Sequence, residues 1–270
     1  MTQNTAATVS PLPGLPALAT AVRGSGPGIL LAHGAGGSIA GNFTPIIPAL
    51  AQGHTVVAPD YPGSGDTPRA AELTLDDLAD ALVASATEAG LETFTLVGYS
   101  LGTLVSVRAA ARHPERVRGL VLTAGLARPD NRALATLDLW RKLLADGDTE
   151  TFARLIALSG FGAPFFNAVP RAELGVFYKL LANGVPAGAF EQAGVVQDSD
   201  TTGDLAGISV PTLVIATTLD TLVTPDNSRM LADRIPGAEY AEIEAGHVVM
   251  AERPEEWERL ILAFLAKHGL

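Results

Sequence analysis

The sequence contains no cysteine. This absence excludes a disulfide framework, catalysis by a thiolate and a zinc site with thiolate ligands. Charged residues make up only 17% of the chain, which argues against a disordered or fibrous protein. No apolar run approaches the roughly 20 residues that a membrane-spanning helix needs. The first 22 residues carry no lysine or arginine and are interrupted by Pro11, Pro13 and Pro16, which is not the pattern of a signal peptide.

Positive charge is also scarce. The chain has 18 basic residues against 29 acidic ones, and its formal net charge is −11. An acidic surface repels the phosphates of nucleic acids and the head groups of anionic lipids. We therefore expect a cytoplasmic protein with no nucleic-acid partner and no membrane partner. The expected partner is a small-molecule substrate, and the sequence leaves a homodimer open.

What the sequence does contain is enough apolar material for one large domain. Its 270 residues are 47% apolar, and short aliphatic runs alternate with helical patterns. Such alternation predicts an α/β fold with a mostly parallel sheet and helices on both faces. We expect strands at Ile29–Leu31, Thr55–Ala58, Phe94–Val97, Leu120–Leu122, Thr212–Ile215 and Tyr240–Ile243. We expect helices at Leu75–Ala89, capped by Thr74, at Leu101–Arg112, and beginning at Pro225 and at Pro254.

One stretch, residues 128–207, breaks the alternation. It has helical patterns but no convincing strand, and it holds more than half of the aromatic residues of the chain. We interpret it as a helical cap inserted into a core made of residues 1–127 and 208–270. The alternative is a second small helical core that does not contact substrate. If it is a cap, we expect four of its aromatic residues to line a substrate pocket: Trp140, Phe161, Phe165 and Phe166.

The segment Gly98-Tyr99-Ser100-Leu101-Gly102 lies directly between an expected strand and an expected helix. A serine at such a junction sits on a tight, strained turn that raises its hydroxyl out of the sheet. Glycines two residues to either side are needed because any side chain there would collide with the neighbouring strand or helix. The pattern therefore indicates that Ser100 is a nucleophile at the positive end of a helix.

From about Gly28 to the C-terminus the sequence resembles the α/β-hydrolase superfamily, in its serine-nucleophile esterase or lactonase branch. Three segments carry the resemblance besides the serine turn. His33-Gly34-Ala35-Gly36-Gly37 is similar to the loop that supplies half of an oxyanion hole, and Asp60–Gly65 to the glycine-rich loop after the next strand. Asp220 and His247 stand at the family's acid and base positions, in the chain order Ser, Asp, His. The resemblance implies an α/β-hydrolase fold with an inserted helical cap.

A serine hydroxyl needs a base to take its proton as it attacks, and the base needs a carboxylate to orient it. Of the five histidines we favour His247, because it follows a strand and a glycine in a short loop. His33 belongs to the oxyanion loop, where an imidazole more often braces the loop than takes a proton. Some relatives place the acid after the preceding strand, but Leu122–Leu126 has no carboxylate, which favours Asp220.

Charge that develops on the substrate oxygen needs preorganised donors. We expect the backbone N–H groups of Leu101 and Ala35 to supply them. Thr103 and Thr217 stand where relatives often have glycine, and we expect neither to touch the triad. No cluster with metal-ligand spacing is found, so no metal and no cofactor is expected. Besides the cap residues, four core residues complete the expected substrate pocket: His33, Gly34, Tyr99 and Val248.

Two rival functions are weighed. A dinucleotide-binding oxidoreductase would need G-x-G-x-x-G, but the segment Gly34–Ile39 ends in Ile. A binding protein without catalysis would not need Ser100, Asp220 and His247 together. Dehalogenase and epoxide hydrolase chemistry use an aspartate where Ser100 stands. We therefore predict hydrolysis of an ester or lactone of a small to medium apolar substrate through an acyl-enzyme. Thioesterase, C–C hydrolase, perhydrolase and acyltransferase chemistry stay open.

Overall fold

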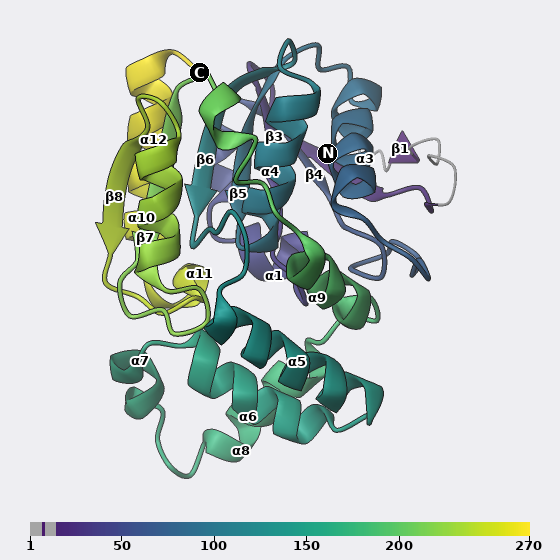
Figure 1. The fold of residues 1–270 in the computed structure, drawn as a ribbon, viewed down its shortest axis with the longest axis vertical. Coiled ribbons are helices and arrows are strands. Elements are labelled where there is room, and N and C mark those ends of the chain that lie inside the picture. The colour runs from purple at the N-terminus through teal and green to yellow at the C-terminus, as the bar shows by residue number, and fades with distance from the viewer. Residues whose placement is uncertain (1–6, 9–14) are drawn as a thin grey trace.

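An eight-stranded sheet forms the middle of the molecule (Figure 1). The computed structural model describes residues 7–8 and 15–270, so Pro11 and Pro13 lie outside the described residues. The strand order is β1-β2-β4-β3-β5-β6-β7-β8. Neighbours from β4 to β8 pair in parallel, whereas β1 and β2 form an antiparallel edge. The strands are β1 (Ala7–Thr8), β2 (Ala19–Arg23), β3 (Gly28–Ala32), β4 (Thr55–Pro59), β5 (Phe94–Tyr99), β6 (Val117–Thr123), β7 (Thr212–Thr217) and β8 (Glu239–Ile243).

All six expected strands are present, and the mostly parallel α/β fold is confirmed. The edge strands β1 and β2 were not expected. In β2 only Ala19–Arg23 pairs, and its single large aliphatic residue is Val22. An edge strand with one covered face does not carry the continuous apolar run that marks the central strands.

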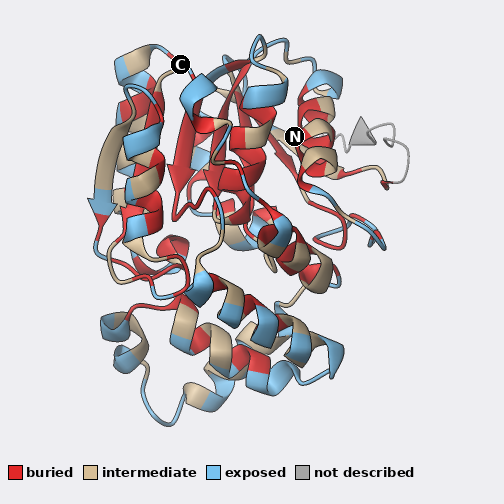
Figure 2. Cartoon of the chain, viewed as in Figure 1, coloured by how far each residue is buried: buried red, intermediate tan, exposed pale blue. Residues whose placement is uncertain are grey.

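Helices cover both faces of the sheet because successive side chains of each central strand point to opposite sides. In β3, Leu30 belongs to one core cluster and Ile29 and Leu31 to the other. One face packs on α3 (Leu75–Glu88), α4 (Leu101–Arg112) and α10 (Pro225–Arg234). The other packs on α1 (Ile39–Phe43), α2 (Ile47–Leu50), α11 (Val249–Glu252) and α12 (Pro254–His268). Figure 2 shows the central strands and the inward sides of the flanking helices buried.

The helix boundaries agree with the end signals in the sequence. Thr74 is the N-cap of α3, and its side chain accepts a hydrogen bond from the Asp77 N–H at 3.1 Å. This helix ends at Glu88, one residue before the expected Ala89. The helices α10 and α12 begin at Pro225 and Pro254 as expected. No helix in the described part of the chain is long and apolar enough to cross a membrane.

A helical insertion separates β6 from β7. It contains α5 (Asn131–Ala145), α6 (Thr149–Gly160), α7 (Ala163–Ala168), α8 (Leu174–Asn183) and α9 (Ala189–Asp198), followed by a short 3-10 turn, η1 (Leu205–Gly207). Helices α5 to α8 lie together at the end of the molecule toward which the arrows of β6 and β8 point (Figure 1). The two ends of the insertion meet, because the N–H of Thr201 donates to the carbonyl oxygen of Ala127 at 2.8 Å.

Candidate active site

Ser100 lies at the junction of β5 and α4 in a strained backbone conformation. Its φ of 54° and ψ of −119° fall in a region that few residues other than glycine adopt. The flanking glycines have no room for a side chain. A Cβ on Gly98 would lie 2.5 Å from the Gly102 carbonyl oxygen, and a Cβ on Gly102 would lie 1.9 Å from that of Ala32. The turn therefore requires both glycines, as the sequence pattern predicts.

The serine, the histidine and the aspartate form one hydrogen-bonded chain. His247 Nε2 lies 2.9 Å from Ser100 Oγ, and His247 Nδ1 lies 2.7 Å from Asp220 Oδ2. The carboxylate can only accept, so Nδ1 carries the proton and Nε2 faces the serine hydroxyl as an acceptor. These three side chains come from the turns that follow β5, β7 and β8, at one edge of the sheet. The imidazole is thus placed to take a proton from Ser100.

Asp220 is held by more than the imidazole. It is 4% exposed, and its Oδ1 accepts the backbone N–H groups of Leu222 and Val223, each at 2.9 Å. Thr217 donates its hydroxyl to Oδ2 at 3.0 Å. The expectation that Thr217 does not touch the triad is therefore wrong. Its side chain occupies the position beside the carboxylate that a glycine would leave without a donor.

Thr103 also contacts the triad, contrary to expectation. Its hydroxyl donates to the carbonyl oxygen of Ser100 at 2.7 Å. The same carbonyl also accepts the backbone N–H of Thr103 at 2.8 Å, so Thr103 is bonded to the strained turn by both its side chain and its backbone. A hydroxyl three residues after Ser100 is visible in the sequence, but its hydrogen-bond partner depends on the geometry of the turn.

Tyr99 holds the backbone of the histidine loop. Its hydroxyl donates to the His247 carbonyl oxygen at 2.9 Å, and its ring lies 5.1 Å from the imidazole ring. Burial raises the pKa of Tyr99 well above its ordinary value, and the negative charges of Asp220 and Glu252 add to the effect. The phenol therefore stays protonated at neutral pH and keeps donating to this carbonyl.

The two backbone N–H groups expected to form an oxyanion hole belong to Leu101 and Ala35. Leu101 is the first residue of α4, where the helix supplies no acceptor for the N–H. The backbone N–H groups on both sides of Ala35 already have acceptors, because Gly34 N–H donates to Asn42 Oδ1 and Gly36 N–H to Gln192 Oε1. Within residues 15–270 the Ala35 N–H donates to no acceptor. Gln192, from α9 of the insertion, was not singled out in the sequence.

His33 lies behind this loop and not in the pocket where we expected it. It is fully buried, its Nδ1–H donates to the Gly34 carbonyl oxygen at 2.8 Å, and its Nε2 accepts the Tyr61 N–H at 2.9 Å. Its ring packs on Tyr61 with 4.1 Å between ring centroids. Burial lowers the pKa of His33 to about 4, although the bond to Gly34 opposes that shift. The imidazole is therefore neutral and braces the loop.

The lowered pKa of His33 makes stability depend on pH. The unfolded chain takes up this proton near pH 6.5, whereas the folded chain takes it up only near pH 4, so acidification between these values favours unfolding. On the order of 3 kcal/mol should be lost across this window. Urea unfolding at pH 7, 5.5 and 4.5 should show the stability gap between wild type and His33→Asn narrowing as the pH falls. Parallel curves for the two proteins would contradict this assignment.

An apolar cavity of about 220 Å³ opens beside the histidine. The expected residues Tyr99, Trp140, Phe161 and Val248 line it, together with His247 and Ala35. Ser100 is not in its wall but is reached through His247, 2.9 Å away. Several aliphatic and aromatic residues of the wall were not expected: Phe152, Ile156, Leu180, Leu181, Val185 and Leu222.

Gly34, Phe165 and Phe166 do not line this cavity, unlike our expectation. Gly34 packs against Tyr99, where an added Cβ would lie 2.8 Å from the ring. Phe165 stacks on Phe161 with 5.3 Å between centroids, and of this pair only Phe161 lines the cavity. Phe166 packs on Phe177 and lines a separate hollow beside Asp220. Aromatic composition locates the insertion's core but does not say which ring of a Phe-Phe pair turns inward.

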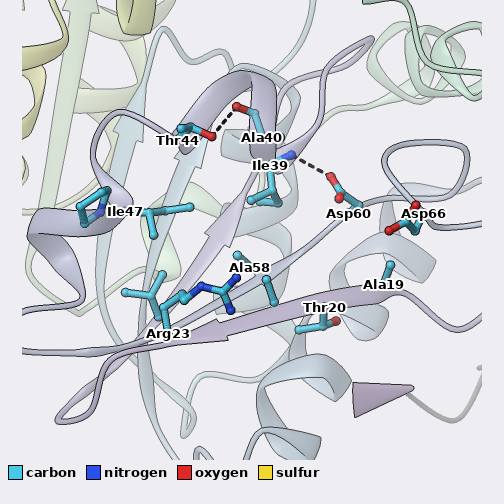
Figure 3. A pocket seen from close by; sticks show the side chains of 13 residues that line it. Ala19, Thr20, Arg23, Ile39, Ala40, Thr44, Ile47, Ala58, Asp60 and Asp66 are labelled. Carbon is cyan, nitrogen blue, oxygen red and sulfur yellow. Dashed lines mark hydrogen bonds between the residues drawn. The ribbon is translucent and has the colours of Figure 1, made fainter. Parts of the chain in front are cut away.

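A larger hollow of about 420 Å³ lies elsewhere, between β2 and the short helices α1 and α2 (Figure 3). Asp60 and Asp66 lie across it from Arg23 in this view. Asp60 accepts the Ile39 N–H at 2.7 Å, and burial raises its pKa. None of the three residues Ser100, Asp220 and His247 lines this hollow. In the described part of the chain, no group of three His, Asp or Glu side chains could hold a metal ion.

Several known proteins are similar to this chain in sequence and fold. A family model described as alpha/beta hydrolase fold matches residues 27–254. The chain is 35% identical to pyrrolizixenacetamide deacetylase of Xenorhabdus hominickii, over 90% of this chain and 92% of that protein. It is 28% identical to pimeloyl-[acyl-carrier protein] methyl ester esterase of Chromobacterium violaceum, over 90% and 95%. A thermophilic esterase from Thermogutta terrifontis superimposes with a TM-score of 0.85 at 25% identity, covering 99% of both chains. The chain therefore belongs to the α/β-hydrolase fold family.

Proposed function

We propose that this protein hydrolyses an ester or lactone bond of a small to medium apolar substrate, with Ser100 as nucleophile, His247 as base and Asp220 as the orienting acid. One observation carries the proposal. The hydrogen-bonded chain from Ser100 Oγ through His247 to Asp220 stands beside an apolar cavity. A buried carboxylate, an imidazole of fixed tautomer and a serine on a strained turn together make an activated nucleophile.

In the acylation step, His247 Nε2 takes the proton of Ser100 Oγ as the oxygen bonds to the substrate carbonyl carbon. The carbonyl electron pair moves onto the oxygen, which we place between the N–H groups of Leu101 and Ala35. Collapse of this intermediate re-forms the carbonyl and expels the alcohol, which takes the proton from His247. Asp220 stabilises the imidazolium throughout.

In the deacylation step, a water molecule gives its proton to His247 Nε2 and attacks the acyl carbon. The second tetrahedral intermediate then releases the acid, and the proton returns to Ser100. Trp140 and Phe161 come from the helical insertion and line the cavity. This supports the interpretation of residues 128–207 as a cap that keeps bulk water away from the acyl-enzyme.

The cavity favours a modest apolar acyl group. About 220 Å³ is below the range of roughly 300–1,000 Å³ of drug-sized pockets. Most of its wall is aliphatic or aromatic, so a charged acyl group would lose its hydration without a partner. We therefore expect p-nitrophenyl esters of short to medium uncharged acids to be turned over, and succinate-type esters to be poor substrates.

Acyl-chain length should measure the cavity directly. Each methylene that enters it should raise kcat/KM by roughly 0.8 kcal/mol, about fourfold, until the cavity is full. Ile156→Ala enlarges the cavity, so the acyl chain with the highest kcat/KM should become longer by at least one methylene. Leu158→Ala is the matched control, because this leucine lies on the same helix, is 67% exposed and does not line the cavity. An unchanged profile in both variants would exclude this cavity as the acyl site.

A second candidate is hydrolysis of a small acetamide, favoured by the 35% identity to a protein named as a deacetylase. An amide needs His247 to protonate a poor leaving group, while the serine and oxyanion chemistry stays the same. Matched phenyl acetate and acetanilide substrates distinguish the two candidates. Comparable kcat/KM on both would favour the deacetylase, and turnover of the ester alone would favour the esterase.

A further inference from the structure

Glu252, the last residue of α11, is a buried acid that the mechanism above does not use. It is 9% exposed, and no Lys, Arg or His side chain among residues 15–270 forms an ion pair with it. Its two carboxylate oxygens accept separate backbone N–H groups. Gly162 N–H donates to Oε1 and Gly246 N–H to Oε2, both at 3.0 Å. Burying an acid is costly unless hydrogen bonds compensate for its lost hydration. These two bonds therefore stabilise Glu252 in its buried position.

The two N–H groups belong to different parts of the chain, one to the loop that carries His247 and one to the helical insertion. Gly246 directly precedes His247. Gly162 directly follows Phe161, whose side chain lines the cavity. A third bond joins the same two segments, because Val248 N–H donates to the Gly160 carbonyl oxygen at 3.0 Å. The segment Gly160–Gly162 of the insertion is therefore bonded on both sides of His247.

The backbones approach as closely as they do because two of these residues are glycines. A Cβ on Gly246 would lie 2.2 Å from the nitrogen of Gly162, and a Cβ on Gly162 would lie 2.9 Å from Glu252 Oε2. Any residue with a Cβ at position 246 would therefore push the two segments apart. The carboxylate of Glu252 lies beside this contact and supplies the acceptors for the N–H groups of Gly162 and Gly246.

We propose that Glu252 is a positioning residue that fixes Gly160–Gly162 of the insertion to the loop carrying His247. In this way one carboxylate sets both the wall of the acyl cavity, through Phe161, and the placement of the base. The inference rests on the function proposed above for His247. It adds a link between substrate selection and catalysis, made by a residue that touches neither the substrate nor Ser100.

The test is Glu252→Gln, which keeps the size of the side chain but replaces one acceptor oxygen with an NH₂ group. One of the two N–H groups then faces a donor, and its segment must move. With p-nitrophenyl acetate and hexanoate, kcat should fall for both esters because the His247 loop is loosened. KM should rise only for hexanoate, whose chain reaches the wall at Phe161. Together these should lower kcat/KM for hexanoate roughly 10- to 100-fold, and for acetate several-fold less.

Amide hydrogen exchange gives a readout independent of activity. Exchange should quicken in peptides covering 160–166 and 244–250 and stay unchanged in the central strands. Ser85→Ala is the control, since it removes a buried hydroxyl that donates to Ala81 within α3, away from both segments. If Glu252→Gln does not fold, Gly162→Ala is the second variant, because the added methyl group disturbs the contact of Gly162 with Glu252. It should likewise lower kcat/KM more for hexanoate than for acetate.

Unchanged ester selectivity and unchanged exchange in a folded variant would overturn the positioning role. If wild type turns over no ester, the proposed function fails instead. The exchange measurement then still decides the positioning role, by whether the two segments loosen together.

Discussion

Replacing Ser100 by alanine should lower kcat by about 10⁶-fold and abolish labelling by a fluorophosphonate. Among the residues that the structure describes, the hydroxyl is the only group bonded to His247 Nε2, so its loss leaves the base without a nucleophile. The fold should be retained, because alanine has the same Cβ at the strained φ of 54°. Intact-mass measurement of the labelled protein, together with steady-state kinetics, tests both parts.

Ser38→Ala is the matched control for this experiment. Ser38 also lines the cavity, but its Oγ accepts the Gly41 N–H as a helix cap and has no base beside it. Ser38→Ala should therefore still be labelled stoichiometrically, as wild type is. Stoichiometric labelling of Ser100→Ala would reject Ser100 as the nucleophile.

Asp220→Asn should lower kcat by up to about 10⁴-fold while leaving the fold intact. The geometry predicts which way the amide will turn. Leu222 and Val223 both donate N–H groups to the Oδ1 position, so the amide oxygen belongs there. The NH₂ group then occupies the Oδ2 position and donates to His247 Nδ1. This forces the imidazole proton onto Nε2, where it can no longer accept the proton of Ser100.

The control here is Asp226→Asn, an exposed carboxylate in the first turn of α10. It should leave kcat unchanged. Because the tautomer is the cause, Asp220→Asn should still be labelled by fluorophosphonate, only far more slowly. Activity near wild type in Asp220→Asn would mean that another carboxylate orients the base.

The central strands and the serine turn could be predicted because their causes are local. A buried parallel strand must be apolar on both faces, and a turn as tight as that at Ser100 must have glycine at 98 and 102. Strand β2 has no such requirement, since it forms through pairing with β1 and β4 and not through its own composition.

The contacts that complete the site depend on how the chain folds in three dimensions. Gln192 reaches the N–H of Gly36 from 156 residues away. Thr217 is only three residues from Asp220, but it reaches the carboxylate because the turn after β7 folds back. In the sequence, nothing distinguishes Glu252 from other acidic residues that precede a helix beginning with proline. For the phenylalanines, the short helix α7 turns Phe165 and Phe166 away from the cavity, and no periodicity over six residues predicts that direction.

The bond between Thr201 and Ala127 has an evolutionary meaning. It closes the insertion at its base, so the chain leaves the sheet after β6 and returns toward β7 at nearly the same place. Residues between these points can be lengthened, shortened or replaced without moving the strands that carry Ser100, Asp220 and His247. If the insertion is the substrate cap that we propose, exchanging it would change the substrate while the core stays the same. A replacement insertion would still have to keep contacts with the core such as those of Gln192 with Gly36 and of Gly162 with Glu252.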